Sequence, residues 1–169
     1  MMTIARDSLI HCFDDDALFG MPVTLVDAVF CETDEDGEEI YTFPNADELT
    51  AAVALARVLI PVRLQAADVR GLRKACGMTA TAFAKAVGMN PSTLSRIEND
   101  AQGMGDYLEK LIRIHVAETL ATSAPGVAYA GARDIIAMHL TTGTGRVRVT
   151  IRRGHGAADD QHYTLGRAA

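Results

Sequence analysis

Two glycines divide residues 72–98 into short helical segments, and this pattern constrains the fold more than any other feature of the chain. Gly77 and Gly88 can each adopt the left-handed conformation that ends a helix. Thr79 and Asn90, which follow the two glycines at a spacing of two residues, are favourable N-cap residues for the next helix. The pattern therefore predicts three short helices, at about 67–75, 80–87 and 91–98.

The predicted helices can share one small apolar core. Apolar side chains recur in them at helical spacing: Phe83, Ala84, Val87, Leu94 and Ile97. Pro91 suits the first position of the last helix, where its missing N–H is not needed. Two helices joined by a short turn that contains glycine form a helix-turn-helix.

The polar side chains outside this core predict a surface that reads DNA. On the last helix they are Asn90, Ser92, Thr93, Ser95 and Arg96. They lie near the helix N-terminus, the end that a recognition helix inserts into the major groove. An arginine there can bind O6 and N7 of guanine, and serine or threonine can reach bases or phosphates. The helix N-terminus itself attracts phosphate.

The same stretch resembles the Cro/C1-type helix-turn-helix, also called the XRE family. The matching segments are Leu-Arg-Lys at 72–74, Gly-Met-Thr at 77–79, Phe-Ala at 83–84, Val-Gly-Met at 87–89 and Ser-Thr-Leu-Ser-Arg-Ile-Glu-Asn at 92–99. The resemblance covers residues 66–120, about a third of the chain.

The resemblance implies roles for individual residues. Arg73 would pair with Glu98 and tie the first helix to the end of the third. The residues expected to contact DNA are the base-reading Ser92 and Arg96, the phosphate-binding Asn90 and Asn99, and their neighbours Thr79, Lys85, Pro91, Thr93 and Ser95. Two departures weaken phosphate binding: Ala80 stands where the family often has glutamine, and the loop 100–104 has no cation. The alternative interpretation is a helical module that serves as a protein–protein adaptor.

The net charge of −6 is distributed unevenly along the 169 residues. Residues 1–61 hold 2 basic and 13 acidic side chains, residues 62–122 hold 8 and 6, and residues 123–169 hold 6 and 3. We therefore predict three regions: an acidic N-terminal one, a helix-turn-helix domain and a small basic C-terminal one. With so few excess cations, the protein should bind bulk DNA weakly. Specific binding would then depend on base contacts and on dimerisation.

The N-terminal region predicts a β-hairpin followed by a helix. Residues 23–30 and 40–43 are rich in apolar and β-branched types, and Asp36-Gly37 suits the turn between them. The acidic run 32–39 lacks EF-hand spacing. It is typical of a solvated tip, or of an acidic surface that meets a basic protein or mimics DNA. Asn45 can cap a helix over 46–60, whereas residues 1–20 have no clear pattern.

This order of hairpin, helix and helix-turn-helix is similar to that of bacterial antitoxins and repressors of the MqsA type. Those proteins usually carry an N-terminal zinc domain with two Cys-x-x-Cys pairs. Here the region holds only Cys12 and Cys31, too few ligands for a closed tetrahedral zinc site. We therefore predict no metal and no cofactor, and both cysteines as small core residues.

The C-terminal part predicts one more helix and a small sheet. Asp106 can cap a helix to about 121, with His115 as a buried, satisfied histidine on its apolar stripe. After a break at 123–126, alternating apolar residues predict strands at 134–140 and 146–152, with a further short one at 163–165. A sheet this small is marginal alone, and strand exchange with a second subunit would complete it.

Three arginines would lie on one face of the strand 146–152: Arg146, Arg148 and Arg152. Such a row can contact a phosphate backbone, or it can simply keep an edge strand soluble. The sequence leaves both interpretations open.

Together, these patterns predict an α+β protein. A central all-α helix-turn-helix bundle is flanked by an N-terminal β-hairpin plus helix and by a small C-terminal antiparallel β-sheet. The predicted function is a sequence-specific transcriptional regulator, by default a repressor, that binds double-stranded DNA as a homodimer. The alternative is an antitoxin or anti-activator that binds a basic protein, such as a toxin, through its acidic N-terminal region and autoregulates its own promoter.

Other functional classes lack support in the sequence. There is no Ser/His/Asp arrangement with supporting turns, no paired carboxylates in an apolar setting and no complete metal site, so an enzyme is not expected. The chain has no run of 18 apolar residues and no signal-like N-terminus. Its 3 cysteines are an odd number and include no close pair, which suits a reducing cytoplasm.

Overall fold

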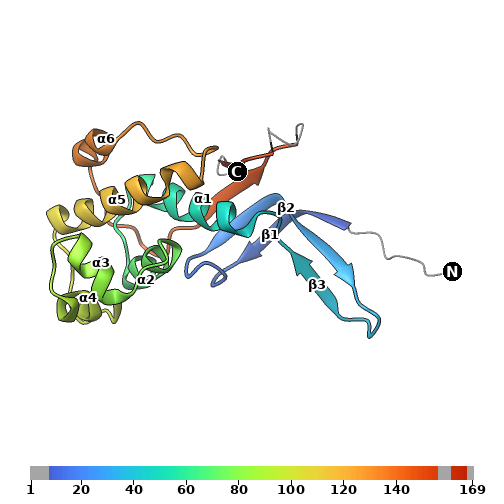
Figure 1. The fold of residues 1–169 in the computed structure, drawn as a ribbon, viewed down its shortest axis with the longest axis horizontal. Coiled ribbons are helices and arrows are strands. Elements are labelled where there is room, and N and C mark those ends of the chain that lie inside the picture. Colours follow the sequence, from blue (N-terminus) through green and yellow to red (C-terminus); the bar gives the residue numbers. More distant parts are fainter. Residues whose placement is uncertain (1–7, 156–160, 167–169) are drawn as a thin grey trace.

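The computed structural model describes residues 8–155 and 161–166 and has an α+β fold, as predicted (Figure 1). A mixed sheet lies at one end and a bundle of helices at the other, with α1 between them. The strands are β1 (Ser8–Asp15), β2 (Val23–Thr33), β3 (Glu39–Thr42), β4 (Val149–Arg153) and β5 (Tyr163–Leu165). The helices are α1 (Ala46–Leu59), α2 (Ala66–Ala75), α3 (Ala80–Ala86), α4 (Pro91–Glu98), α5 (Asp106–Leu120) and α6 (Ala132–Ala137), with a 3-10 turn, η1 (Ala121–Ser123).

The long strand β2 organises the sheet. It pairs with β1 antiparallel along its length and with β3 antiparallel at its far end, where Phe30 faces Thr42. The predicted hairpin is therefore confirmed, with Gly37 at a φ of 85° in its turn. The first half of β2 pairs with β4 in parallel, and β5 adds to β4 antiparallel.

The prediction of a separate C-terminal sheet is wrong. Strands β4 and β5 extend the N-terminal sheet within the same chain, so the fold needs no strand exchange to complete it. The reason is burial: Val149 and Ile151 are fully buried beside Val23 and Leu25, which are themselves fully buried. Pairing of β2 with β4 thus removes the apolar side chains of both strands from water.

Three local predictions also require correction. Residues 134–140 do not form a strand, because 132–137 coil into α6 and bury Ile135 against the core. Strand β1 was not predicted, because a register shift between Ile10 and Cys12 interrupts its alternation. Cys12 is exposed and Cys31 is only partly buried, so neither is the core residue that was predicted. The part of the 1–20 segment before residue 8 lies outside the described residues.

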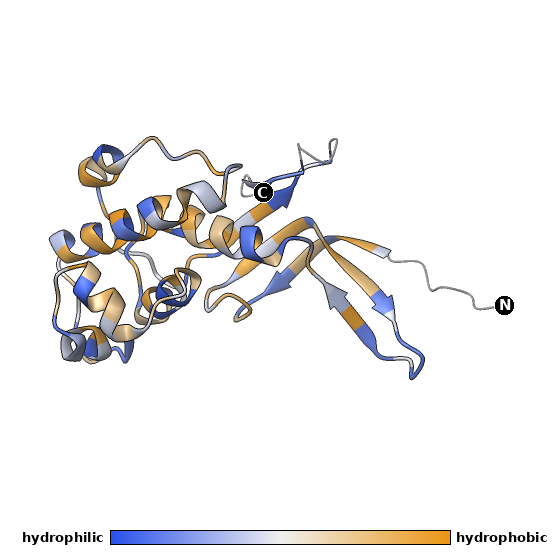
Figure 2. Ribbon diagram, in the orientation of Figure 1, coloured by the Kyte–Doolittle hydropathy of each residue, from blue (hydrophilic) through white to orange (hydrophobic). Residues whose placement is uncertain are grey.

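Helix α1 is the hub of the core. As the sequence predicted, Asn45 caps it, by accepting a hydrogen bond from the Glu48 N–H at 3.4 Å, and Pro61 lies just beyond its end. Nearly every side chain from Leu49 to Val58 is buried, because the sheet covers one side of the helix and α5 the other. The many alanines permit this close approach. Figure 2 shows the hydrophobic colour along β2 and the hydrophilic colour at the β2–β3 turn.

Two buried arginines fix the segment that leads from α1 into α2. Arg57 donates to the carbonyls of Val62 and Arg63 at 3.0 and 2.9 Å and to Asp68 at 2.9 Å. Arg113 donates to the Val62 carbonyl at 2.6 Å, while Glu109 accepts from it at 2.8 Å. Both arginines are fully buried, so this network holds α2 and α5 in a defined relation to α1.

Candidate nucleic-acid interface

Helices α3 and α4 form the predicted helix-turn-helix. The Thr79 hydroxyl accepts from the Ala82 N–H at 3.2 Å and begins α3. Gly88, at a φ of 70°, ends it, and the Met89 N–H closes on the Ala84 carbonyl at 2.9 Å. This pattern is a Schellman motif. The predicted core is confirmed, since its five apolar residues are buried: Phe83, Ala84, Val87, Leu94 and Ile97.

Asn90 caps α4 and also orients its first polar side chain. Its Oδ1 accepts from the Ser92 N–H at 2.9 Å and from the Ser92 hydroxyl at 2.8 Å. Because the hydroxyl proton is used in this bond, Ser92 presents lone pairs outward. It is thus set to accept a hydrogen bond, for example from an exocyclic amino group of a base.

The end of α4 is clamped to α2. Arg73 donates from Nε and Nη2 to the two carboxylate oxygens of Glu98, at 2.7 and 3.0 Å. Arg70 donates to the Glu98 carbonyl at 2.7 Å and to Asn99 Oδ1 at 2.9 Å. Asn99 in turn donates to the Ser95 carbonyl at 2.8 Å. Asn99 and Ser95 therefore have intramolecular partners, and α4 is held rigidly at the end opposite its cap.

Two exposed cations of α3 and α4 remain available to bind a ligand. Lys85 on α3 and Arg96 on α4 are exposed, and neither forms a side-chain hydrogen bond or ion pair within the described part of the chain. Pro91 is exposed and Thr93 half-buried at the start of α4. The arrangement presents one ammonium from the last turn of α3 and one guanidinium from the last turn of α4, so Arg96 does not lie near the helix N-terminus as predicted. This arrangement can bind an anionic, hydrogen-bonding surface such as a DNA groove.

Two residues of α2 were not predicted to have a role here. Arg70 positions Asn99, and Lys74 is an exposed cation one position beyond Arg73. The signal for Arg70 was its spacing: it precedes Arg73 by three residues, so both side chains share one face of the helix.

Helix α5 packs against the helix-turn-helix. Gly105, not Asp106, is its N-cap, because Asp106 lies in the first turn and pairs with Arg63. His115 is half-buried, with its ring 5.4 Å from that of Phe83 and Nε2 3.3 Å from Met78 Sδ. This burial lowers the pKa of His115 from its usual 6.5.

The three C-terminal arginines lie away from α4, beside the N-terminal strands. Arg146 donates to the Gly20 carbonyl at 2.6 Å, and Arg148 donates to the Val23 carbonyl at 2.8 Å and pairs with Asp16. Arg152 donates to Asp27 at 3.1 Å. These bonds attach the C-terminal segment to acidic residues and carbonyls of the N-terminal region.

Metal ligands do not converge in the part of the chain that the structure describes. No group of three or more histidine, cysteine, aspartate or glutamate side chains is arranged there to hold an ion. Within the same ranges, no helix is both long and apolar enough to cross a membrane.

Comparison with known proteins identifies the central module. Residues 66–119 match the family model described as a helix-turn-helix domain. The chain thus contains a helix-turn-helix DNA-binding domain in α2 to α5, which supports a role in transcription regulation. Domains of this family are typically not enzymes. No curated protein and no solved structure matched the chain.

Proposed function

We propose that this protein is a sequence-specific transcriptional regulator that inserts α4 into the major groove of double-stranded DNA. The observation that carries the proposal is Arg96: it is an exposed guanidinium without a partner among the described residues, on a helix that is capped at one end and clamped at the other. The backbone that carries such a side chain is already positioned when it meets a base, so little conformational entropy is lost on binding.

The residues around Arg96 have complementary roles in this proposal. Arg96 binds guanine through O6 and N7, and Ser92 and Thr93 contact neighbouring bases. Phosphates are bound by Lys85 and by groups at the two helix N-termini. The remaining contacts come from Thr79, Asn90, Pro91, Ser95 and Asn99.

A homodimer follows from the small number of base-reading groups. One bidentate arginine discriminates between bases by about 1–3 kcal/mol, which is too little to select one site in a genome. Two copies on a two-fold operator double the readout, with half-sites about one helical turn apart. Binding across a promoter would then block transcription, so repression is the proposed outcome.

The direct test is selection of bound sequences from a random DNA library with the full chain, at a stated salt concentration, since affinity depends on it. We expect a palindromic motif whose half-sites contain guanine. The Arg96→Ala variant should lose the guanine preference at one position of each half-site, while its circular dichroism spectrum and unfolding midpoint stay unchanged. Selection of the same motif by both proteins would exclude the assignment of Arg96.

A second candidate function rests on the β2–β3 hairpin, which projects from the sheet (Figure 1). Its turn carries the acidic run 32–39, and next to it Ile40 and Tyr41 are 47% and 41% exposed. An acidic tip beside exposed apolar side chains suits a basic protein partner. This would make the chain an antitoxin or anti-activator that autoregulates its promoter, with an arrangement similar to MqsA-type proteins.

This second candidate has its own test. The protein encoded beside this chain would be titrated with the full chain and with an Ile40→Ser/Tyr41→Ser variant. A small basic neighbour that binds the former and not the latter supports the candidate. Absence of binding to the full chain excludes it for that neighbour and leaves the DNA-binding proposal unaffected.

A further inference from the structure

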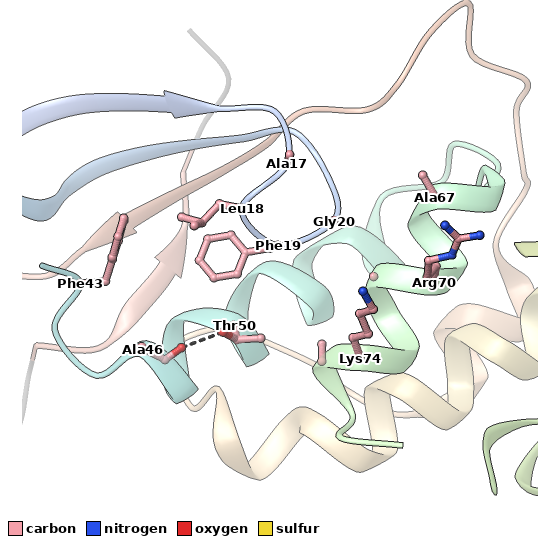
Figure 3. A pocket seen from close by; sticks show the side chains of 12 residues that line it. Ala17, Leu18, Phe19, Gly20, Phe43, Ala46, Thr50, Ala67, Arg70 and Lys74 are labelled. Carbon is pink, nitrogen blue, oxygen red and sulfur yellow. Dashed lines mark hydrogen bonds between the residues drawn. The ribbon is translucent and has the colours of Figure 1, made fainter. Parts of the chain in front are cut away.

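A hollow of about 510 Å³ opens between the β1–β2 loop, the start of α1 and one face of α2 (Figure 3). No residue of α3 or α4 lines it, although Arg70 and Lys74 of α2 do. Its size lies in the range of small-molecule sites, which is about 300–1,000 Å³. Its two sides differ chemically: apolar side chains line one, and cations of α2 line the other.

The apolar side is formed by Leu18, Phe19 and Phe43. Figure 3 shows the Phe19 ring between Leu18 and α1, with Phe43 beyond it. Leu18 is 45% exposed, so part of its apolar surface stays accessible on this side of the hollow. Aspartate caps this loop, because Asp15 Oδ1 accepts from the Ala17 N–H at 2.7 Å.

Two glycines fix the loop against α2, so the hollow exists before any ligand arrives. A Cβ on Gly20 would lie 3.0 Å from the Gly71 Cα, and a Cβ on Gly71 would lie 2.9 Å from the Phe19 carbonyl oxygen. Gly20 also has a φ of 72°, which favours glycine. The loop and the helix are therefore in direct backbone contact along one wall.

The cationic side has one available charge. Lys74 forms no side-chain hydrogen bond or ion pair within residues 8–155 and 161–166, and Figure 3 shows its ammonium on the side of α2 that faces Phe19. Arg70 also lines the hollow, but it is already bonded to Glu98 and Asn99. The described lining contains no carboxylate. An unpaired ammonium beside an apolar surface complements a ligand with one anionic end and an apolar body.

We propose that this hollow binds a small amphipathic carboxylate. The carboxylate pairs with Lys74, and the apolar body lies along Leu18, Phe19 and Phe43. Arg70 connects this site to the DNA-reading face, because it lines the hollow and holds Asn99 at the end of α4. Binding of the carboxylate in the hollow does not depend on whether α4 reads DNA.

Isothermal titration of the full chain with sodium decanoate, below its micelle-forming concentration, tests the proposal. We expect saturable binding of one molecule per chain and roughly tenfold tighter binding than that of octanoate, because two more methylenes are buried. Decyltrimethylammonium, with the same chain and the opposite charge, should bind at least fivefold more weakly. Equal binding of the two ions, or no saturable binding of decanoate, overturns the proposal.

Variants then locate the site. Lys74→Gln should weaken decanoate binding about fivefold and remove the preference over the cationic ligand. Arg133→Gln is the matched control, since Arg133 is an exposed cation on α6 outside the hollow; it should bind decanoate as the parent chain does. A similar loss in both variants would mean non-specific charge attraction and overturns the proposal.

A Leu18→Ser variant separates a ligand from a second copy of the chain as the occupant. It should bind decanoate more weakly without changing the sedimentation coefficient of the free protein. If the variant instead converts a dimer into a monomer, the hollow is covered by the partner subunit, and the proposed ligand site is excluded.

Discussion

Arg73 and Glu98 form a bidentate ion pair that joins α2 to the end of α4, with N–O distances of 2.7 and 3.0 Å. The two side chains are only 15% and 8% exposed, so water screens the pair weakly. The hydrogen bond to Glu98 raises the pKa of Arg73 above its usual value. The pair therefore holds the recognition helix against the rest of its domain.

Breaking this pair from one side should destabilise the domain. We expect Arg73→Met to lower the free energy of unfolding by about 2–4 kcal/mol, because Glu98 is left nearly buried without its partner. Urea unfolding followed by circular dichroism measures this. Arg96→Met is the control, because Arg96 is exposed and has no partner in the described ranges 8–155 and 161–166; it should change stability by less than about 0.5 kcal/mol. In an Arg73→Met/Glu98→Leu double variant much of the loss should be recovered, and strictly additive losses would argue against a direct coupling.

Replacement of Arg113 should destabilise the fold more than replacement of Arg73, because Arg113 is fully buried and bonds to α1 and to the segment that follows it. It donates to the carbonyls of Val58 and Ile60 at 2.7 and 2.8 Å as well as to Glu109. Arg113→Met leaves these acceptors unsatisfied, so we expect a loss of about 3–5 kcal/mol in the free energy of unfolding. A loss below about 1 kcal/mol in urea unfolding would mean that water replaces the guanidinium.

The cost of replacing Gly88, in the turn between α3 and α4, should come from backbone conformation rather than from a steric clash. A Cβ on Gly88 would meet no atom within 4 Å, but the φ of 70° is unfavourable for other residues. Gly88→Ala should therefore cost about 1–2 kcal/mol. Gly103→Ala is the matched control, because a Cβ there also meets no atom and its φ is not positive; it should be neutral or slightly stabilising. Equal effects in thermal unfolding would contradict this explanation.

The sequence predicted the helix-turn-helix well because its signals are local. The glycine stops, Thr79 and Asn90 act on residues within one helical turn, so their effect does not depend on the rest of the fold. The face of α4 that carries Arg96 followed from helical spacing alone. The parallel pairing of β2 with β4 could not be predicted in this way, because Val23 and Val149 lie far apart in the chain and no local rule selects that partner.

Short apolar segments were a second reason why secondary structure was predicted wrongly. The Ile-Ile pair at 135–136 suited a strand by composition, yet these residues form α6, where Lys110 donates to the Ile136 carbonyl at 2.7 Å. A run this short has no period that distinguishes helix from strand. For the three C-terminal arginines, charge pattern predicted exposure but not their bonds to the N-terminal region.

The proposed DNA contacts of Lys85 and Arg96 should differ in kind. Lys85→Gln removes one phosphate contact per copy, so the slope of log K against log salt should fall by about 0.9 for each copy bound, with specificity unchanged. Arg96→Ala removes a base contact, so it should cost about 1–3 kcal/mol per half-site and relax the preference at one position. Fluorescence anisotropy on the selected operator and a scrambled duplex measures both. If the two variants weaken both duplexes equally, α4 does not read bases.

His115 gives the helix-turn-helix core a dependence on pH whose sign can be worked out. Burial beside Phe83 lowers its pKa from the usual 6.5, so in the window just below 6.5 the unfolded chain binds more protons than the folded chain. Stability must then rise with pH through this window. This contribution is fully present above 6.5, falls as pH drops toward the folded-state pKa, and is constant below it. We expect His115→Leu to remove this component, leaving a smaller difference between urea midpoints at about pH 7.5 and about pH 5.5. The two proteins differ only at residue 115, so the difference between their pH profiles isolates His115. Parallel profiles would show that the imidazole becomes protonated as easily in the folded core as in the unfolded chain.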